Sequence, residues 1–511
     1  MKSFEARSLS KGEQLDVTLI LEGTYPFVSG GVSSWVHQIV TGLKDIRFGV
    51  VFIGGARESY DQVRYALPDN VRHLESHFLA DVRPMPPARG GSGDAAFYRA
   101  SAEMHEAFRT ALPISYSGTF ETFVDKLCED PERHERDFHY SDRSWKEVTA
   151  RYRASASRLP FTDYFWTVRS MHAPVFALAK VARSLPIARA FHVISTGYAG
   201  LAGAIASKAQ RVPLVLTEHG IYTKERRIEL MQAPWITERA GDARSGEIGF
   251  FRELWIKFFE GLASATYAAA NPIVTLFEGN RARQIADGAD PARTMVIPNG
   301  IDLARFGALR ALRPDGVPPV LALIGRVVPI KDIKTFVRAM RSVVHALPGA
   351  EGWIVGPAVE DPRYAGECRE LIASLGIEGR VKFLGLQNVD DILPRVGLVV
   401  LTSISEAMPL VLLEGFAAGV PCVTSDVGCA RDLVYGRAAE DRALGAAGAV
   451  VGIADPEATA QSAVSLLSDG ARWRAAQAAG AARVEAYYGQ DRMLTRYEQV
   501  YRRALGSAWR G

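Results

Sequence analysis

Short, continuous apolar runs alternate with helical patterns along the whole chain, and these runs form two separate series. The first series comprises residues 17–21, 48–53, 192–195, 213–216 and 273–276, and the second comprises residues 320–324, 353–355, 381–384, 398–401 and 420–424. Uninterrupted apolar runs between helices are typical of parallel strands that helices cover on both faces. Two such series predict an α/β fold with two Rossmann-like, doubly wound domains that face a central cleft.

The boundary between the two series falls in the turn-rich segment 296–302, which a variable, Pro-rich stretch follows. Strand patterns are scarce between residues 81 and 158, so we expect a mostly helical insertion there. The last residues have a basic, amphipathic helical pattern, which predicts a helix that packs back on the first domain; docking on a membrane is the alternative. The expected domains are 1–302 with the insertion 81–158, then 303–486, and a C-terminal helix within 487–511.

Composition and charge exclude several classes of protein. The 60 Lys and Arg residues against 57 Asp and Glu residues give a net charge of +3, which argues against a nucleic-acid partner. The four cysteines lack a C-x-x-C spacing, which suits a reducing compartment rather than a disulfide framework or a zinc site. Neither a secretory signal nor an apolar stretch of about 18 to 20 residues is evident. We therefore expect a cytoplasmic protein, with peripheral attachment to the inner membrane through partner proteins as an alternative.

The segment 402–419 places two carboxylates around a predicted helix start. Glu406 lies in the loop that follows the strand pattern 398–401, and Glu414 lies inside the apolar helix pattern that comes next. The amino end of a helix carries free N–H groups and partial positive charge, so it favours an anion such as a diphosphate. Two carboxylates on either side of that anion suit a sugar nucleotide, because they can accept hydroxyls of the sugar and of the ribose. The alternative is that both glutamates are solvated surface charges.

A glycine turn with two cations follows the first strand pattern of the second series. Gly325 and Arg326 come directly after residues 320–324, and Lys331 follows five residues later, before a helix pattern. Arg can bind phosphate with its planar fork and Lys as a point charge, so this pair is suited to a diphosphate. Basic loop residues that are merely solvated are the alternative interpretation.

These two segments resemble the retaining glycosyltransferases of family 4, which have the GT-B fold. The E-x7-E pair Glu406 and Glu414 and the Gly-Arg…Lys set Gly325, Arg326 and Lys331 carry this resemblance. The N-terminal half looks like the Pel exopolysaccharide glycosyltransferases in the segments 22–26, 30–35, 67–70, 195–200 and 217–222. The resemblance implies a UDP-sugar donor, UDP-glucose first and a UDP-N-acetylhexosamine next, and a polysaccharide acceptor. It also implies partners in an inner-membrane Pel synthase complex.

The resemblance also implies roles for single residues. Arg326 and Lys331 would hold the diphosphate, Glu414 the ribose, and Glu406 hydroxyls of the transferred sugar. Apart from the resemblance, the position of Gly385 after a strand pattern makes it a further expected donor contact, close to the uracil.

In the first domain, Gly30 and Gly31 would form a loop that lets backbone N–H groups approach the ligand. His219 would face the donor, with Glu218 beside it as a weaker candidate for contact with the acceptor. A simple strand–helix connection at Gly30 and a structural role for His219 are the alternatives.

Metal and cofactor patterns are scarce in this sequence. It contains no D-x-D, no P-loop and no complete G-x-G-x-x-G, so we expect a metal-independent enzyme without a cofactor. His73 and His77 are four residues apart, but no acidic third ligand is evident to us. Two other functions stay open: a catalytically idle scaffold that binds a nucleotide sugar in a synthase complex, and a GT-B UDP-sugar epimerase.

Overall fold

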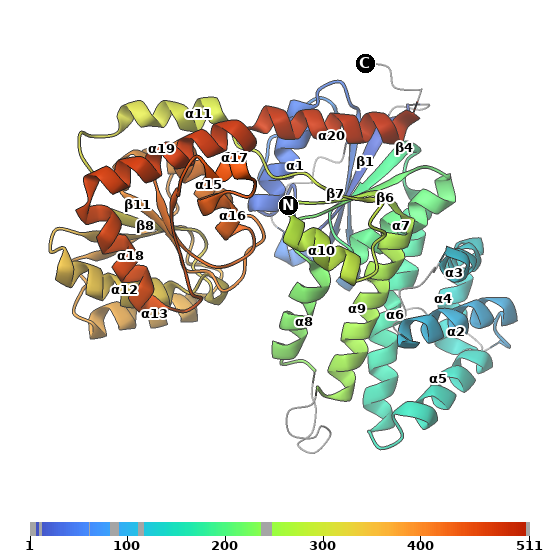
Figure 1. Ribbon diagram of the computed structural model, residues 1–511. Coiled ribbons are helices and arrows are strands. Elements are labelled where there is room, and N and C mark those ends of the chain that lie inside the picture. Colours follow the sequence, from blue (N-terminus) through green and yellow to red (C-terminus); the bar gives the residue numbers. More distant parts are fainter. Residues whose placement is uncertain are drawn as a thin grey trace. The chain divides into compact units, whose positions relative to one another are not determined.

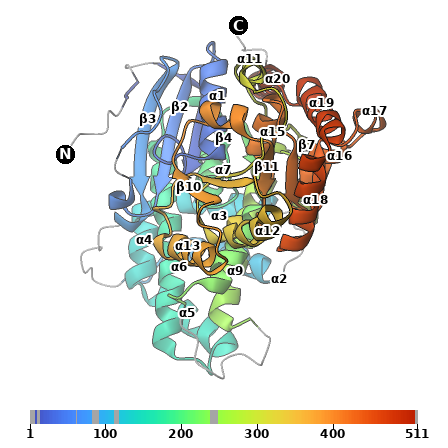
Figure 2. The same ribbon diagram turned by 90° about the vertical axis from the view of Figure 1, so that its left-hand side faces the viewer.

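The computed structural model describes residues 7–9, 13–60, 62–81, 91–110, 117–236 and 248–506. Contacts divide the chain into two compact units: unit 1 comprises Met1–Val296 and Arg496–Gly511, and unit 2 comprises Ile297–Thr495. Each unit contains one parallel sheet with helices around it (Figures 1 and 2), so the predicted fold class is confirmed. Residues 82–90 and 111–116 of the predicted insertion, and residues 507–511 of the predicted C-terminal helix, lie outside the described residues.

Unit 1 is built on a seven-stranded sheet in which every described pair of neighbours is parallel. In spatial order the strands are β3 (Val71–Phe78), β2 (Phe48–Gly54), β1 (Leu15–Glu22), β4 (Ala188–Val193), β5 (Leu214–Glu218), β6 (Ala270–Thr275) and β7 (Thr294–Val296). The central strands are buried along nearly their whole length, as their apolar sequences predict. The strand order reverses between β1 and β4, and this reversal is the switch point of unit 1.

Helices cover both faces of the unit 1 sheet. On one face, Trp35 of α1 (Gly31–Gly42) packs against Tyr497 of α20 (Gln490–Leu505), with ring centroids 5.1 Å apart. On the other face lie α7 (Tyr198–Gln210) and α9 (Phe250–Ala269), and α8 (Tyr222–Gln232) and α10 (Glu278–Ala286) complete the unit. A Cβ at Gly203 of α7 would lie 2.3 Å from Val193, so glycine lets this helix approach the sheet closely.

Five helices lie between β3 and β4 in the chain, and the described residues of this segment contain no strand. They are α2 (Ala95–Thr110), α3 (Ser117–Glu129), α4 (Pro131–Tyr140), α5 (Asp142–Ser155) and α6 (Phe161–Ser184). The sequence starts α4 with an Asp130 cap, whose carboxylate accepts from Arg133 N at 3.0 Å, and with Pro131 in the first turn. Ser141 caps α5 in the same way through Ser144 N. The predicted helical insertion in the first domain is confirmed, and Figure 1 shows these helices grouped beside α9 at one end of the unit.

Unit 2 is built on a six-stranded parallel sheet. In spatial order the strands are β10 (Val381–Gly385), β9 (Glu351–Val355), β8 (Val320–Ile324), β11 (Leu398–Leu401), β12 (Cys422–Ser425) and β13 (Gly448–Val451). Its helices are α11 (Leu303–Ala308), α12 (Ile333–Ala346), α13 (Pro362–Ser374), α14 (Val389–Ile392), α15 (Leu410–Ala417), α16 (Ala430–Tyr435), α17 (Ala439–Arg442), α18 (Pro456–Ser468) and α19 (Gly470–Tyr487). The strand order reverses between β8 and β11, which is the switch point of unit 2.

The C-terminal helix α20 has a buried, hydrogen-bonded face within unit 1. Tyr501 and Tyr497 are fully buried. His192 Nδ1 of β4 lies 2.7 Å from the Tyr501 hydroxyl, and Thr217 Oγ1 of β5 lies 3.2 Å from the Tyr497 hydroxyl. The amphipathic pattern of the last residues therefore forms core contacts with the unit 1 sheet. Of the described helices, none combines the length and apolar character that crossing a membrane requires.

Candidate functional site

The switch point of unit 2 brings together two of the predicted site residues. Open α/β sheets bind ligands beyond the carboxyl ends of their strands at such a point. Lys331 belongs to η4 (Pro329–Lys331), in the loop after β8, and Glu406 lies in the loop after β11. Lys331 Nζ forms an ion pair with Glu406 Oε1.

Neighbouring hydrogen bonds fix this ion pair. Ser403 Oγ donates to Glu406 Oε1 at 2.7 Å, and Thr402 Oγ1 donates to the Lys331 carbonyl at 3.0 Å. A backbone bond of 2.8 Å from Ile404 N to the Ile330 carbonyl joins the same two loops. The side chains of Lys331 and Glu406 are 21% and 16% exposed, so they are shielded yet reachable by a ligand. A cation and a carboxylate are thus held in place at the carboxyl end of the sheet.

The loop after β12 contacts the Glu406 loop, and the sequence analysis did not identify this contact. Gly428, after β12, has a φ of +54°, and a Cβ there would lie 2.2 Å from the Ala407 carbonyl oxygen. The next residue, Cys429, donates its backbone N–H to that same oxygen at 3.0 Å. Glycine at position 428 is therefore required both by its backbone conformation and by the close approach. In the sequence, the glycine of Val-Gly-Cys (residues 427–429), shortly after a strand pattern, was the feature that could have indicated this tight loop.

Arg326 is positioned by a different partner. Its Nη1 donates to both carboxylate oxygens of Glu360, at 2.6 and 2.7 Å, and the two side chains are about half exposed. An exposed pair of this kind contributes only about 0–1 kcal/mol, so a phosphate can displace Glu360 at low cost. Arg326 therefore lies after β8, as its sequence position indicates. Its side chain binds Glu360 rather than the Lys331–Glu406 pair.

Glu414 lies half-buried on α15, beside α11 and α14. Burial raises the pKa of Glu414 to about 7, while the positive charge of Arg305 opposes this rise and the negative charge of Asp390 adds to it. Arg305 itself is bound to Asp390 by hydrogen bonds of 2.8–3.1 Å. A carboxyl group with this pKa changes its charge near neutral pH.

The two predicted glycines of unit 2 lie at the carboxyl ends of two strands, β8 for Gly325 and β10 for Gly385, which β9 separates. Gly325 N donates to the Val355 carbonyl at 2.8 Å, and the Gly385 carbonyl accepts from Gly356 N at 2.8 Å. Gly385 has a φ of +69° and ends β10, which is the edge strand and is separated from β8 by β9. Gly325 is therefore at the switch point, whereas Gly385 is at the side of the sheet.

In unit 1, Gly30 and Gly31 begin α1 near the carboxyl end of β1. Gly30 is the N-cap residue, and its carbonyl accepts from Ser34 N at 2.9 Å. A Cβ at Gly30 would meet no other protein atom within 4 Å. The protein itself therefore does not require glycine at position 30, and open space lies beside this backbone.

His219 is buried after β5, and its ring packs edge-on against Trp35 of α1 with centroids 4.7 Å apart. Burial lowers the pKa of His219 to about 4, so the imidazole is neutral at physiological pH. Its Nε2 is buried without a hydrogen-bond partner, whereas both ring nitrogens of the nearby His192 have partners. This free nitrogen is compatible with a ligand contact, and unpartnered buried nitrogens also occur at His37 and His134.

Two glutamates of unit 1 have roles that spacing alone does not reveal. Glu218 is buried and accepts hydrogen bonds from Tyr267 Oη at 2.7 Å, Gln284 Nε2 at 3.0 Å and Tyr222 N at 2.9 Å, so it joins helices to the sheet. Its burial raises its pKa, and these bonds oppose the rise. Glu22, at the end of β1, accepts from Tyr222 Oη at 2.9 Å and faces Arg226 Nη2 at 3.5 Å. Glu22 therefore lies at the switch point of unit 1. Its position at the end of a buried apolar run was the sequence feature that could have identified it.

An acidic neighbour of His73 and His77 was also missed in the sequence. Glu75 lies between them on β3, and its carboxylate is 3.2 Å from the Nε2 atom of each histidine. Glu75 shares a face of the strand with both histidines, because alternate residues of a strand point to the same side. Within the described part of the chain, no group of three or more His, Cys, Asp or Glu residues has the geometry of a metal site.

Comparison with known proteins matches two separate parts of the chain to family models. Residues 15–292 match the model of a family described as a domain of unknown function, DUF3492. Residues 318–469 match the model of the glycosyl transferases group 1. The second match contains Gly325, Arg326, Lys331, Glu406 and Glu414.

Curated relatives and solved structures agree with this assignment. D-inositol 3-phosphate glycosyltransferases from Actinosynnema mirum and Salinispora tropica are 30% and 33% identical over 47% and 42% of this chain. These matches span 57% and 47% of the relatives, so the chain spans about half the length of the curated relatives that it matches. HepE from Anabaena, solved with UDP and glucose, aligns with a TM-score of 0.56 and 16% identity over 95% of this chain and 99% of its own.

Sucrose-phosphate synthase from Thermosynechococcus elongatus aligns with a TM-score of 0.58 and 16% identity over 96% of this chain and 98% of its own. At these identities the two structures show the fold, which is the GT-B arrangement of two Rossmann-like sheets.

Proposed function

The chain belongs to the DUF3492 family and carries a group 1 glycosyltransferase domain, and from this premise we propose that it transfers a hexose from a UDP-sugar to a growing polysaccharide. UDP-glucose is the first candidate donor and a UDP-N-acetylhexosamine the second. The structural neighbour HepE has been solved with UDP-glucose, which supports UDP-glucose as the first choice.

The observation that carries the proposal is the Lys331–Glu406 ion pair at the switch point of unit 2. A donor diphosphate beside Lys331 would compete with Glu406 for its charge, and the carboxylate would then be available for hydroxyls of the sugar. The amino end of α15, which follows the Glu406 loop, adds partial positive charge for the same anion. Arg326 would leave Glu360 to complete the contact with the phosphates.

In the proposed reaction, the bond between the anomeric carbon and the β-phosphate oxygen breaks, and the acceptor hydroxyl oxygen bonds to that carbon on the same face. The acceptor proton passes to the departing phosphate oxygen, so UDP leaves and the anomeric configuration is retained. Negative charge grows on the β-phosphate as the bond lengthens, and Lys331 and Arg326 stabilise it. These fixed cations supply the charge stabilisation, so we propose a transfer that needs no divalent ion.

The remaining residues have supporting roles in this proposal. Glu414 accepts the ribose hydroxyls, and Gly385 lines the base. In unit 1, the open backbone at Gly30 and Gly31 gives the ligand access to N–H groups. His219 offers its unpartnered Nε2 to the transferred sugar or the acceptor, as a neutral hydrogen-bonding group.

The finer assignment, to Pel exopolysaccharide synthesis, rests on the N-terminal segments that resemble that family, including residues 22–26 and 217–222. It would place the protein beside an inner-membrane synthase complex that receives the polymer.

Incubation of the purified protein with UDP-glucose and EDTA tests the proposal. We expect release of UDP, and we expect acceptor-dependent transfer once an oligosaccharide is added. Binding of UDP without turnover on any acceptor would favour an idle scaffold. Conversion of UDP-N-acetylglucosamine without an acceptor would indicate an epimerase.

A further inference from the structure

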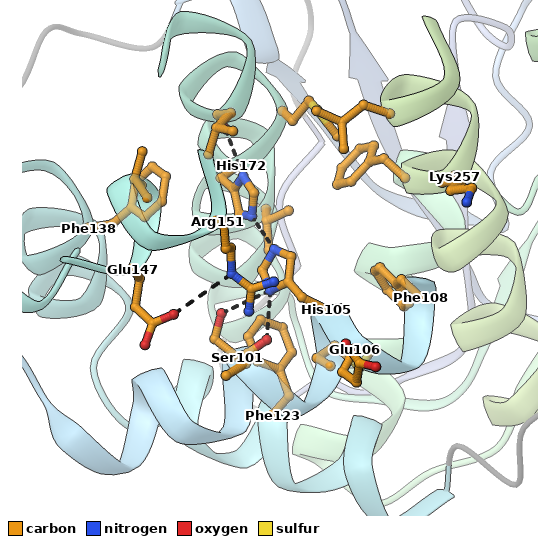
Figure 3. Close-up of a pocket in the computed structure, with 18 of the residues that line it drawn as sticks. Ser101, His105, Glu106, Phe108, Phe123, Phe138, Glu147, Arg151, His172 and Lys257 are labelled. Atoms are coloured by element: carbon orange, nitrogen blue, oxygen red, sulfur yellow. Dashed lines mark hydrogen bonds and ion pairs between the residues drawn. The ribbon is translucent and has the colours of Figure 1, made fainter. Parts of the chain in front are cut away.

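A cavity of about 520 Å³ lies among the helices of unit 1. Its lining residues come from α2, α3, α4, α5, α6, α7 and α9, and none comes from a strand. None of these residues belongs to the candidate site described above. Figure 3 shows the polar and aromatic side chains that surround it.

The walls of this cavity are mostly aromatic and aliphatic. The apolar wall residues include Met104, Phe108, Phe123, Phe138, Met171 and Phe258. A volume of 520 Å³ falls in the range of about 300–1,000 Å³ that is typical of small-molecule sites. Protein interiors are otherwise close-packed, and apolar walls offer water few hydrogen-bond partners, so this space suits an apolar ligand.

A pair of histidines forms the polar part of the wall. His105 of α2 and His172 of α6 face each other with their Nε2 atoms 2.8 Å apart. Each Nδ1 faces a carbonyl of its own helix, at 2.6 Å for His105 and 2.7 Å for His172. A carbonyl only accepts hydrogen bonds, so both Nδ1 atoms must carry a proton.

With both Nδ1 atoms protonated, the two Nε2 atoms that face each other lack a proton in the neutral rings. If both rings are neutral, two Nε2 lone pairs face each other at 2.8 Å, which is repulsive. A third proton between the nitrogens removes the repulsion and gives the pair one positive charge. Burial lowers the pKa of His105 to about 3 and lowers that of His172, and the charge of Arg151 acts in the same direction on both. An anion beside the pair would reverse this balance, because it stabilises the charged form.

The wall of the cavity also contains other charged groups. Arg151 of α5 lies 3.8 Å from Glu147, and Lys257 of α9 lies 3.2 Å from Glu253. The side chains of these four residues are 38–52% exposed, so they lie where the cavity meets solvent. Glu106 of α2 is a further charge of the wall. Arg151 is the charged group of the wall whose positive charge acts on both histidines.

We propose that this cavity binds a long-chain fatty acid, with its carboxylate beside His105, His172 and Arg151 and its alkyl chain along the aromatic wall. The apolar volume accounts for the chain, and the histidine pair beside a guanidinium accounts for the anionic head group. This inference does not depend on the proposed transfer of a sugar.

Titration of delipidated full-length protein with hexadecanoate, hexadecanol and acetate, followed by calorimetry, tests this inference. We expect saturable binding of hexadecanoate, weaker binding of hexadecanol and none of acetate. Ala102→Trp fills the cavity from α2 and should weaken hexadecanoate binding about tenfold or more, which is about 1.4 kcal/mol. Ala96→Trp adds the same side chain at an exposed position of α2 that does not line the cavity, and it should leave binding unchanged.

The head group is tested separately. Arg151→Met should weaken hexadecanoate binding about threefold, as expected for a partly exposed charge contact, and leave hexadecanol binding unchanged. Arg153→Met, at an exposed position of α5 outside the wall, is its control. Far-UV circular dichroism and the thermal unfolding midpoint should stay close to the wild-type values in all four variants, which shows that unit 1 is folded in each. Failure of the wild type to bind hexadecanoate, an equal loss in Ala96→Trp, or tighter binding of hexadecanol would each overturn the proposal.

Discussion

Lys331 Nζ and Glu406 Oε1 form an ion pair that joins the loop after β8 to the loop after β11. Ser403 Oγ shares the same carboxylate oxygen at 2.7 Å. Because both charged side chains lie at the switch point of unit 2, a donor diphosphate would enter the site by exchanging one of these contacts. Substitutions of Lys331 and of Glu406 should therefore have different effects on UDP binding and on turnover.

In our proposal Lys331 stabilises the leaving phosphate, so Lys331→Met should lower turnover about 10²- to 10³-fold and weaken UDP binding. Glu406→Gln should strengthen UDP binding, because it removes the carboxylate that competes for Lys331, but it should lower turnover by a similar factor, because in our proposal Glu406 acts on the sugar. Lys334→Met is the matched control, since Lys334 forms a comparable ion pair with Glu367 at 2.7 Å. Steady-state UDP release and UDP titration measure these effects. Equal turnover in Lys331→Met and Lys334→Met would remove Lys331 from the site.

Glu360→Gln should strengthen UDP binding. It removes the carboxylate that occupies Arg326 at 2.6 and 2.7 Å and leaves the guanidinium free for phosphate. The gain should be at most about fivefold, because exposed pairs contribute only about 0–1 kcal/mol, and it should shrink as salt is added. Arg326→Met should instead weaken binding. Titration of UDP at low and high ionic strength checks both signs, and weaker binding in Glu360→Gln would contradict the exchange.

Gly428→Ala should displace the Glu406 loop. The new Cβ would lie 2.2 Å from the Ala407 carbonyl oxygen, and the φ of +54° is itself unfavourable for alanine. Gly376→Ala is a control for the backbone term, because Gly376 has a φ of +67° but open space around its missing Cβ. We expect both variants to lose about 1 kcal/mol of stability from the backbone, and only Gly428→Ala to lose most of its turnover. Thermal unfolding and UDP release measured on the same samples separate the two effects.

The raised pKa of Glu414 predicts two pH effects of opposite sign. The unfolded carboxyl ionises near its ordinary pKa of 4.5 and the folded one near 7, so the native state binds more protons between these values. The free energy of unfolding should therefore fall as the pH rises through this window and level off above it. UDP affinity should rise between about pH 6 and pH 8, because the ionised carboxylate accepts ribose hydroxyls more strongly. Glu414→Gln should flatten both profiles, and an unchanged pH dependence in this variant would exclude Glu414 as the titrating group.

Tyr501→Phe should destabilise unit 1 through the C-terminal helix. It removes the hydroxyl that lies 2.7 Å from His192 Nδ1 and leaves a buried polar atom without a partner. The expected cost is about 1–3 kcal/mol. Tyr487→Phe, at a half-exposed position on α19, should cost much less. Denaturant unfolding of the two variants makes the comparison, and equal stabilities would show that the helix contributes little to the unit 1 core.

The fold could be predicted from sequence because its signal is local. Strands such as β1 and β8 are continuous apolar runs, and such runs are buried in both sheets. Strand β3 was not predicted because it is an edge strand, where residues such as Glu75 and His77 stay partly exposed and break the apolar run.

The candidate site could be predicted only in part, because some of its contacts join loops that are far apart in the sequence. Lys331 and Glu406 could be proposed because both follow predicted strands at one edge of a sheet. The pairing of Arg326 with Glu360 and the support from Gly428 depend on contacts between separate loops, and no local spacing encodes them. The cavity lined by His105 and His172 likewise depends on how helices from distant parts of the chain pack.

A crystal structure of the protein with UDP and EDTA would decide whether the switch point of unit 2 is the donor site. We expect a β-phosphate oxygen within hydrogen-bond distance of Lys331 Nζ, Arg326 released from Glu360, and the ribose hydroxyls on Glu414. Well-defined UDP bound away from the carboxyl ends of β8 and β11, with the Lys331–Glu406 pair undisturbed, would contradict this assignment.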